Sequence, residues 1–111
     1  MEIDKYYKPD LNALAESIVQ WRRDKGFVTN RENVMEKLML VVTELADAAE
    51  EYRHDPTLTQ TKTLDNFTEE IADAYIRLLD LTGSLGIDIA IAIHNKMLVN
   101  EKRPHKHGKQ L

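Results

Sequence analysis

The sequence contains no cysteine, which excludes disulfides, thiolate zinc sites and thiol catalysis. No apolar run approaches the roughly 18 residues that a transmembrane helix requires, so we expect no membrane partner. The first residues, Met-Glu-Ile-Asp-Lys, lack the apolar segment of a signal peptide. Together these absences predict a cytoplasmic protein.

The chain of 111 residues is short, and we expect one domain over residues 1–111. The hydrophobic fraction of 42% and the charged fraction of 31% are typical of a folded globular chain. A net charge of −4 argues against nucleic-acid binding. The stretch from Lys96 to Leu111 is nevertheless basic, with Glu101 as its one acid, whereas the middle of the chain is acidic. This asymmetry suits a ligand that is both metal-chelated and polyanionic.

Apolar spacing and helix breakers predict an all-α fold, a four-helix bundle-like domain without strands. The helices are expected at about 10–25, 30–54, 66–83 and 87–102, with a tail over 103–111. Asp10 is expected to be the first N-cap, and Thr29-Asn30-Arg31-Glu32 reads as a capping box that opens the second helix.

Two acidic pairs with equal spacing lie inside apolar helical runs: Glu44-Leu45-Ala46-Asp47 and Glu70-Ile71-Ala72-Asp73. Residues three apart on a helix share one face, about 4.5 Å apart along the axis. A single pair is most simply a solvated face. Only Asp73 has a basic residue four positions later, Arg77, so the carboxylates are expected to stay unneutralised until a cation binds.

If the two pairs face each other, Glu44, Asp47, Glu70 and Asp73 form a cage of oxygen ligands for Mg2+ or Mn2+. Glu51 follows Asp47 by one turn and is a candidate fifth ligand or a base that orients water. A redox di-iron centre needs two Glu-x-x-His motifs, and the chain has one, ending at His54. We therefore do not expect a di-iron centre.

Three ordered motifs resemble the MazG-like all-α nucleoside triphosphate pyrophosphohydrolases. They are Leu38 to Glu50 around the first pair, Glu69 to Ala74 around the second, and Lys96-x-x-x-Asn100-x-x-Arg103-Pro104 followed by His107-Gly108-Lys109. The resemblance covers about residues 11 to 109. The chain departs from the family at Thr43 and Asp47, where many relatives have Glu, and this leaves the number of metal ions open.

The resemblance implies Mg2+-dependent hydrolysis of a (deoxy)nucleoside triphosphate to the monophosphate and pyrophosphate, as in nucleotide-pool cleaning. Glu44 or Glu51 would then orient the attacking water and accept its proton. Lys96, Asn100 and Arg103 form one helical stripe that would bind phosphate. The alternative is that basic residues at the end of this helix only complement the helix dipole. Trp21 is either a stacking platform for the base or a core residue.

Two alternatives remain at this stage: a phosphoribosyl-ATP pyrophosphohydrolase, and a non-enzymatic helical module whose acidic patch docks a basic partner. The fourth predicted helix carries apolar residues on more than one face, which predicts burial against another subunit. We therefore expect a homodimer or a dimer of dimers, with each active site assembled at a subunit interface.

Overall fold

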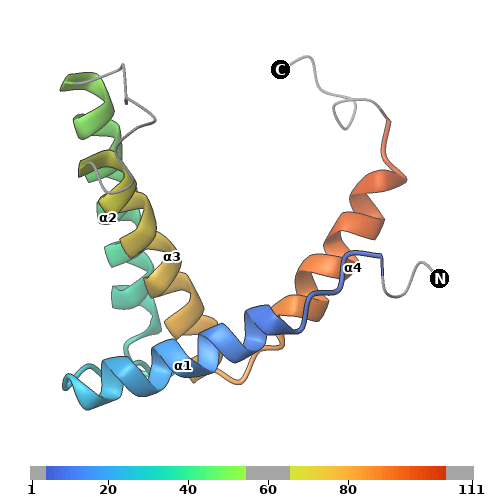
Figure 1. Cartoon of the computed structure of the whole chain (residues 1–111), viewed down its shortest axis with the longest axis horizontal. Helices are drawn as coiled ribbons and strands as arrows, with labels where there is room; N and C mark the ends of the chain where they lie inside the picture. Colours follow the sequence, from blue (N-terminus) through green and yellow to red (C-terminus); the bar gives the residue numbers. More distant parts are fainter. Residues whose placement is uncertain (1–4, 55–65, 105–111) are drawn as a thin grey trace.

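The computed structural model describes residues 5–54 and 66–104. They form α1 (Asp10–Asp24), α2 (Val34–His54), α3 (Asn66–Ser84) and α4 (Ile89–Glu101), with no strand in the described ranges (Figure 1). The predicted all-α class is confirmed. No described helix is both long and apolar enough to cross a membrane. The segment between the second and third predicted helices lies outside the described residues, as does the tail beyond Pro104.

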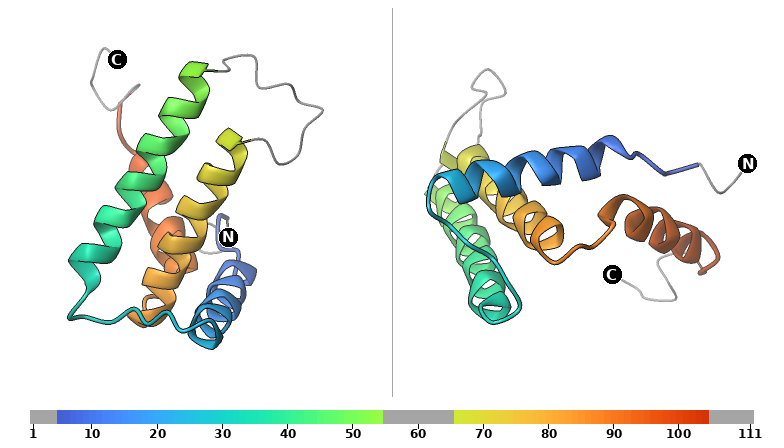
Figure 2. Two further views of the ribbon diagram at one scale, coloured as in Figure 1. Left: turned by 90° about the vertical axis from the view of Figure 1, so that its left-hand side faces the viewer. Right: turned by 90° about the horizontal axis from the view of Figure 1, so that it is seen from below.

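The four helices do not close into a compact bundle. α2 and α3 run side by side as an antiparallel hairpin, and α1 crosses the base of this hairpin (Figure 2). α4 continues from the base and leans away from α2 and α3, so that the hairpin and α4 form the two arms of a V (Figure 1). α4 therefore makes its main helix contacts with α1.

Two glycines follow the ends of helices α1 and α3. Gly26 and Gly86 have φ angles of 93° and 71°, a left-handed conformation that costs glycine little. At the first, the amide N–H of Phe27 donates to the Arg22 carbonyl at 2.9 Å. At the second, the N–H of Ile87 donates to the Thr82 carbonyl at 2.9 Å. This pattern closes a helix by satisfying its last carbonyls.

The beginnings of the helices differ from the expectation at two places. Thr29 is not a capping residue, because its hydroxyl donates to Asp80 Oδ2 at 2.6 Å and α2 begins only at Val34. Asn30 and Asn33 instead each accept the other's backbone N–H. Asp10 is the first residue of α1, which has no side-chain cap.

The N-cap that the sequence reading missed is Asp88, which begins α4. Its carboxylate accepts the Ile91 N–H at 3.0 Å and the Asn12 side-chain amide at 2.7 Å. Asn12 in turn accepts the Ala90 N–H at 3.0 Å, so one residue of α1 holds the first turn of α4. The bond from Asn12, and then that from Ile91, lower the pKa of Asp88 below its usual range.

A buried ion pair joins α1 to α3. Arg22 Nε donates to Asp80 Oδ2 at 3.0 Å, and the two side chains are only 9% and 6% exposed. Thr29 and Ser84 also donate to this carboxylate, which is therefore well satisfied. Nearby, a side chain at Gly83 would place its Cβ 2.7 Å from Val19 Cγ2, so glycine allows α1 and α3 to approach closely.

We expect Asp80→Ala to lower the free energy of unfolding by about 3–5 kcal/mol, because it leaves the Arg22 charge buried without a partner. Urea unfolding followed by circular dichroism would measure the loss. The matched control is Asp24→Ala, which removes an exposed carboxylate that accepts from Gln20 and should cost less than about 1 kcal/mol. Equal losses in the two variants would contradict a central role for the buried pair.

Candidate metal centre

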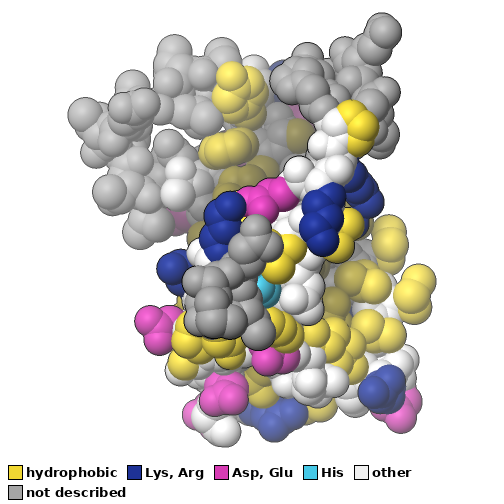
Figure 3. Space-filling view, turned by 90° about the vertical axis from the view of Figure 1, so that its right-hand side faces the viewer, with side chains coloured by type: hydrophobic (Ala, Val, Ile, Leu, Met, Phe, Trp, Pro, Cys, Tyr) yellow, Lys and Arg dark blue, Asp and Glu magenta, His cyan; other side chains and the backbone are white. Residues whose placement is uncertain are grey.

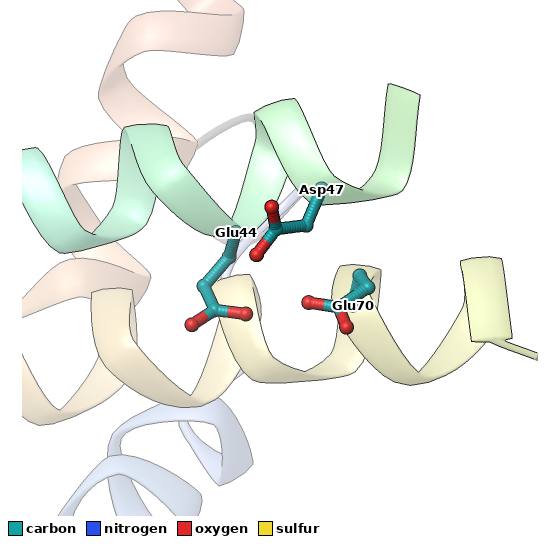
Figure 4. A group of neighbouring side chains, drawn as sticks. All are labelled: Glu44, Asp47 and Glu70. Carbon is teal, nitrogen blue, oxygen red and sulfur yellow. The ribbon is translucent and has the colours of Figure 1, made fainter. Parts of the chain in front are cut away.

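Three of the four predicted carboxylates meet between α2 and α3. Glu44 and Asp47 come from α2, Glu70 comes from α3, and their side chains point toward one another (Figure 4). One carboxylate oxygen from each lies within 4.8 Å of the other two. Glu44 and Glu70 are half-buried and Asp47 is exposed. We call these three residues the acidic cluster.

Two other predicted carboxylates stay outside this group. Asp73 is exposed on α3, one turn after Glu70, and still lies near enough for its charge to act on Glu70. Glu51 is half-buried one turn after Asp47. Neither belongs to the described group of possible metal ligands. The predicted four-carboxylate cage is thus a group of three in this structure, with Asp73 beside it.

The expectation that the carboxylates carry no basic partner is wrong for Glu44. Arg77 Nε lies 3.2 Å from Glu44 Oε1, across the interface between α3 and α2. The sequence reading had assigned Arg77 to Asp73, four residues earlier on the same helix. The pairing across the helices neutralises part of the cluster's charge and orients the Glu44 carboxylate.

The pKa of Glu70 is raised from 4.5 to about 7, chiefly because its side chain shares a hydrogen bond with Glu44. Partial desolvation and the charges of Glu44, Asp47 and Asp73 raise the pKa further. Glu70 therefore keeps its proton at mildly acidic pH, where a free glutamic acid would be ionised. A cation entering the cluster has to displace this proton.

The predicted phosphate-binding residues lie on the other arm of the V. Lys96 and Asn100 belong to α4 and Arg103 follows its end, whereas the acidic cluster lies between α2 and α3. On the face that includes α4, Lys and Arg side chains lie among hydrophobic ones (Figure 3). Within the described ranges, the buried side-chain oxygen of Asn100 has no hydrogen-bond partner. The chain's own α4 is thus not placed over its own acidic cluster.

Trp21 is not a core residue of this chain. It lies on α1 and is 51% exposed. Phe27, just beyond α1, is equally exposed and stacks against the guanidinium of Arg22, with 4.7 Å between Arg22 Cζ and the ring centroid. The sequence left two interpretations open for Trp21. Its exposure contradicts the one that places it in the core of the single chain.

Apolar side chains line two adjoining hollows along α3. One, of about 300 Å³, is bounded by Leu45, Ile71, Ala74, Tyr75 and Leu78. The other, of about 220 Å³, is bounded by Leu11, Tyr75, Leu78, Leu79, Thr82, Ile89 and Ile93. Because Tyr75 and Leu78 line both, the hollows form one surface, which we call the inner apolar surface. Tyr75 is 65% exposed there, so a large aromatic side chain stands open to solvent in the middle of this surface.

Comparison of the chain with protein-family models, with curated proteins and with solved structures finds no match.

The sequence reading missed the role of Arg77, although a signal was present. Arg77 follows Glu70 by seven residues, which places both on one face of α3. If α3 presents Glu70 to α2, it also presents Arg77 to α2. The partner of Arg77 depends on the alignment of the two helices, which periodicity within one helix does not reveal.

We expect the metal-free protein to lose stability as pH rises from about 5 to about 8. The folded state holds the Glu70 proton more tightly than the unfolded state, so this contribution is present below pH 4.5 and is lost through about pH 7. Thermal unfolding in EDTA would measure the trend. Adding Mg2+ at the higher pH should restore the melting temperature, because the cation replaces the proton.

The control for this pH dependence is Glu70→Gln, which cannot ionise and should flatten the profile. An identical profile in the variant and the parent protein would show that another group causes the pH dependence.

Proposed function

We propose that this protein is a metal-dependent hydrolase that cleaves nucleoside triphosphates, including deoxynucleotides, to the monophosphate and pyrophosphate. The observation that carries the proposal is the meeting of Glu44, Asp47 and Glu70 between two helices, with Arg77 attached to Glu44. Such an arrangement combines ligands for a cation with a fixed positive charge. A role in removing unwanted nucleotides from the cellular pool would follow from this reaction.

The donor set fits a hard divalent cation. All three groups of the acidic cluster are carboxylates, and their oxygens lie close enough to share one ion. Oxygen ligands without histidine or cysteine favour Mg2+ or Mn2+ over zinc or iron. When bound, Mg2+ would supply charge neutralisation for the phosphate chain and a lower pKa for bound water. Asp73, one turn from Glu70, would complete the negative environment.

The carboxylate best suited to orient the attacking water is Glu51. Glu44 already contacts Arg77 and Glu70, so its oxygens are engaged. Glu51 is half-buried, lies one turn beyond Asp47 and stays outside the acidic cluster. Its carboxylate can accept a proton from water as that water attacks phosphorus. This choice refines the two candidates, Glu44 and Glu51, that the sequence left open.

A second copy of the chain would complete the site. The inner apolar surface exposes Tyr75, Leu78 and Ile93, and burying such surface is the main driving force of association. The basic residues of α4 are separated from the chain's own acidic cluster, so they could reach such a cluster only on another copy. We propose a homodimer, or a dimer of dimers, in which α4 of one copy supplies Lys96 and Asn100 to the cluster of the other.

The first test of the reaction is a panel of purified triphosphates with Mg2+, scored by product. We expect pyrophosphate release, with a loss of at least about a hundredfold in Glu70→Gln or Asp47→Asn, since each removes a charged ligand. The matched control is Glu69→Gln, which changes an exposed neighbour on the same helix and should retain activity. Orthophosphate as the sole product, or no turnover across the panel, would contradict the proposal.

The test of the composite site is sedimentation combined with the activity assay. Tyr75→Asp places a charge on the inner apolar surface and should give monomers without activity. Mixing two inactive variants, Glu70→Gln and Lys96→Ala, should restore activity, because mixed dimers contain one site with both residues intact. A fully active monomer, or a mixture that stays inactive, would contradict assembly across an interface.

A further inference from the structure

Arg77 on α3 forms an ion pair with a carboxylate of the acidic cluster. Its Nε lies 3.2 Å from Glu44 Oε1 on α2. The two side chains are 26% and 14% exposed, so solvent screens their interaction only in part. The other described basic groups near the end of α2, Arg53 and His54, pair with Glu50 outside the cluster.

The guanidinium has donors to spare. Arginine carries five N–H groups in a planar fork, and the contact with Glu44 uses the one on Nε. Among the described residues, no further hydrogen bond or ion pair engages the terminal nitrogens Nη1 and Nη2 of Arg77. Holding the fork through Nε limits its rotation, so the terminal N–H groups are pre-oriented for an anion.

Glu44 could serve two positive partners at once. Its carboxylate contacts the guanidinium of Arg77, and a cation held by the acidic cluster would contact the same carboxylate. A ligand that satisfies both must carry several anionic oxygens along its length, since the cation takes some and the guanidinium takes another. A phosphate chain meets this requirement, and arginine forms strong charge-assisted hydrogen bonds to phosphate oxygens.

We propose that Arg77 is a substrate-binding residue that donates from its terminal nitrogens to an oxygen of a metal-chelated polyphosphate chain. The inference rests on the proposed function, because it assigns a role within the same site. It also makes the hairpin itself, before any second copy is added, a binding site for the metal–polyphosphate unit. The base and the sugar would be recognised elsewhere.

The test uses inorganic tripolyphosphate, which carries the phosphate chain without a base or sugar. Mn2+ binding to the full chain is first measured by electron paramagnetic resonance, and tripolyphosphate binding to the Mn2+-loaded protein is then measured by calorimetry. The variants are Arg77→Gln and Arg77→Lys. The Lys variant keeps the positive charge beside Glu44, so it should stay folded even if Arg77→Gln does not. The matched control is Arg53→Gln, which removes a guanidinium that also pairs with a glutamate of α2 but is 75% exposed.

We expect Arg77→Gln to bind Mn2+ at least as tightly as the parent protein, because a repelling positive charge has been removed. Its affinity for tripolyphosphate should fall by about tenfold or more, with a smaller loss in Arg77→Lys and none in Arg53→Gln. Unchanged tripolyphosphate affinity in Arg77→Gln would overturn the proposal. Parallel losses of Mn2+ and tripolyphosphate affinity would also overturn it, since Arg77 would then only orient Glu44.

The outcome is separable from that of the proposed function. Wild-type protein that binds Mn2+–tripolyphosphate through Arg77 but hydrolyses no triphosphate supports this inference and contradicts the hydrolase. Triphosphate turnover that is unaffected by Arg77→Gln supports the hydrolase and contradicts this inference.

Discussion

The candidate site depends on the close packing of α2 against α3. Ala48 and Ala74 are buried, and such small side chains let two helix backbones approach closely. At this distance Glu44 and Asp47 of one helix lie opposite Glu70 of the other. Negative charges held this close repel one another, so the hairpin gains its geometry at an electrostatic cost.

Two features of the structure offset that repulsion without a cation. At mildly acidic pH Glu70 retains a proton in its hydrogen bond with Glu44, and Arg77 places a positive charge against Glu44. The cluster is therefore kept in a form that a divalent cation can enter by displacing a proton. The same compensation explains how the residues between two packed helices can include several acids, since unpaired charge would otherwise disfavour burial.

Much of this arrangement follows from the chain read residue by residue. Apolar periodicity predicted four helices, and the structure has four over the described residues. The repeated spacing of acids predicted the cluster. The predictions failed for residues whose actual partners lie on another helix. Thr29 fits a capping box, but its hydroxyl donates to Asp80. Arg77 fits a pair with Asp73, but it pairs with Glu44. Such partners come from another helix, so no local pattern identifies them.

The sequence by itself determined the helices and the faces on which the acids lie, because backbone hydrogen bonding and a period of 3.6 residues are local properties. The tertiary structure decided which faces meet. It joined three of the four acids, left Asp73 and Glu51 at the margin, and placed α4 with Lys96 on the far arm of the V. These outcomes depend on the rotation and offset of whole helices, which are set by packing among side chains distant along the chain.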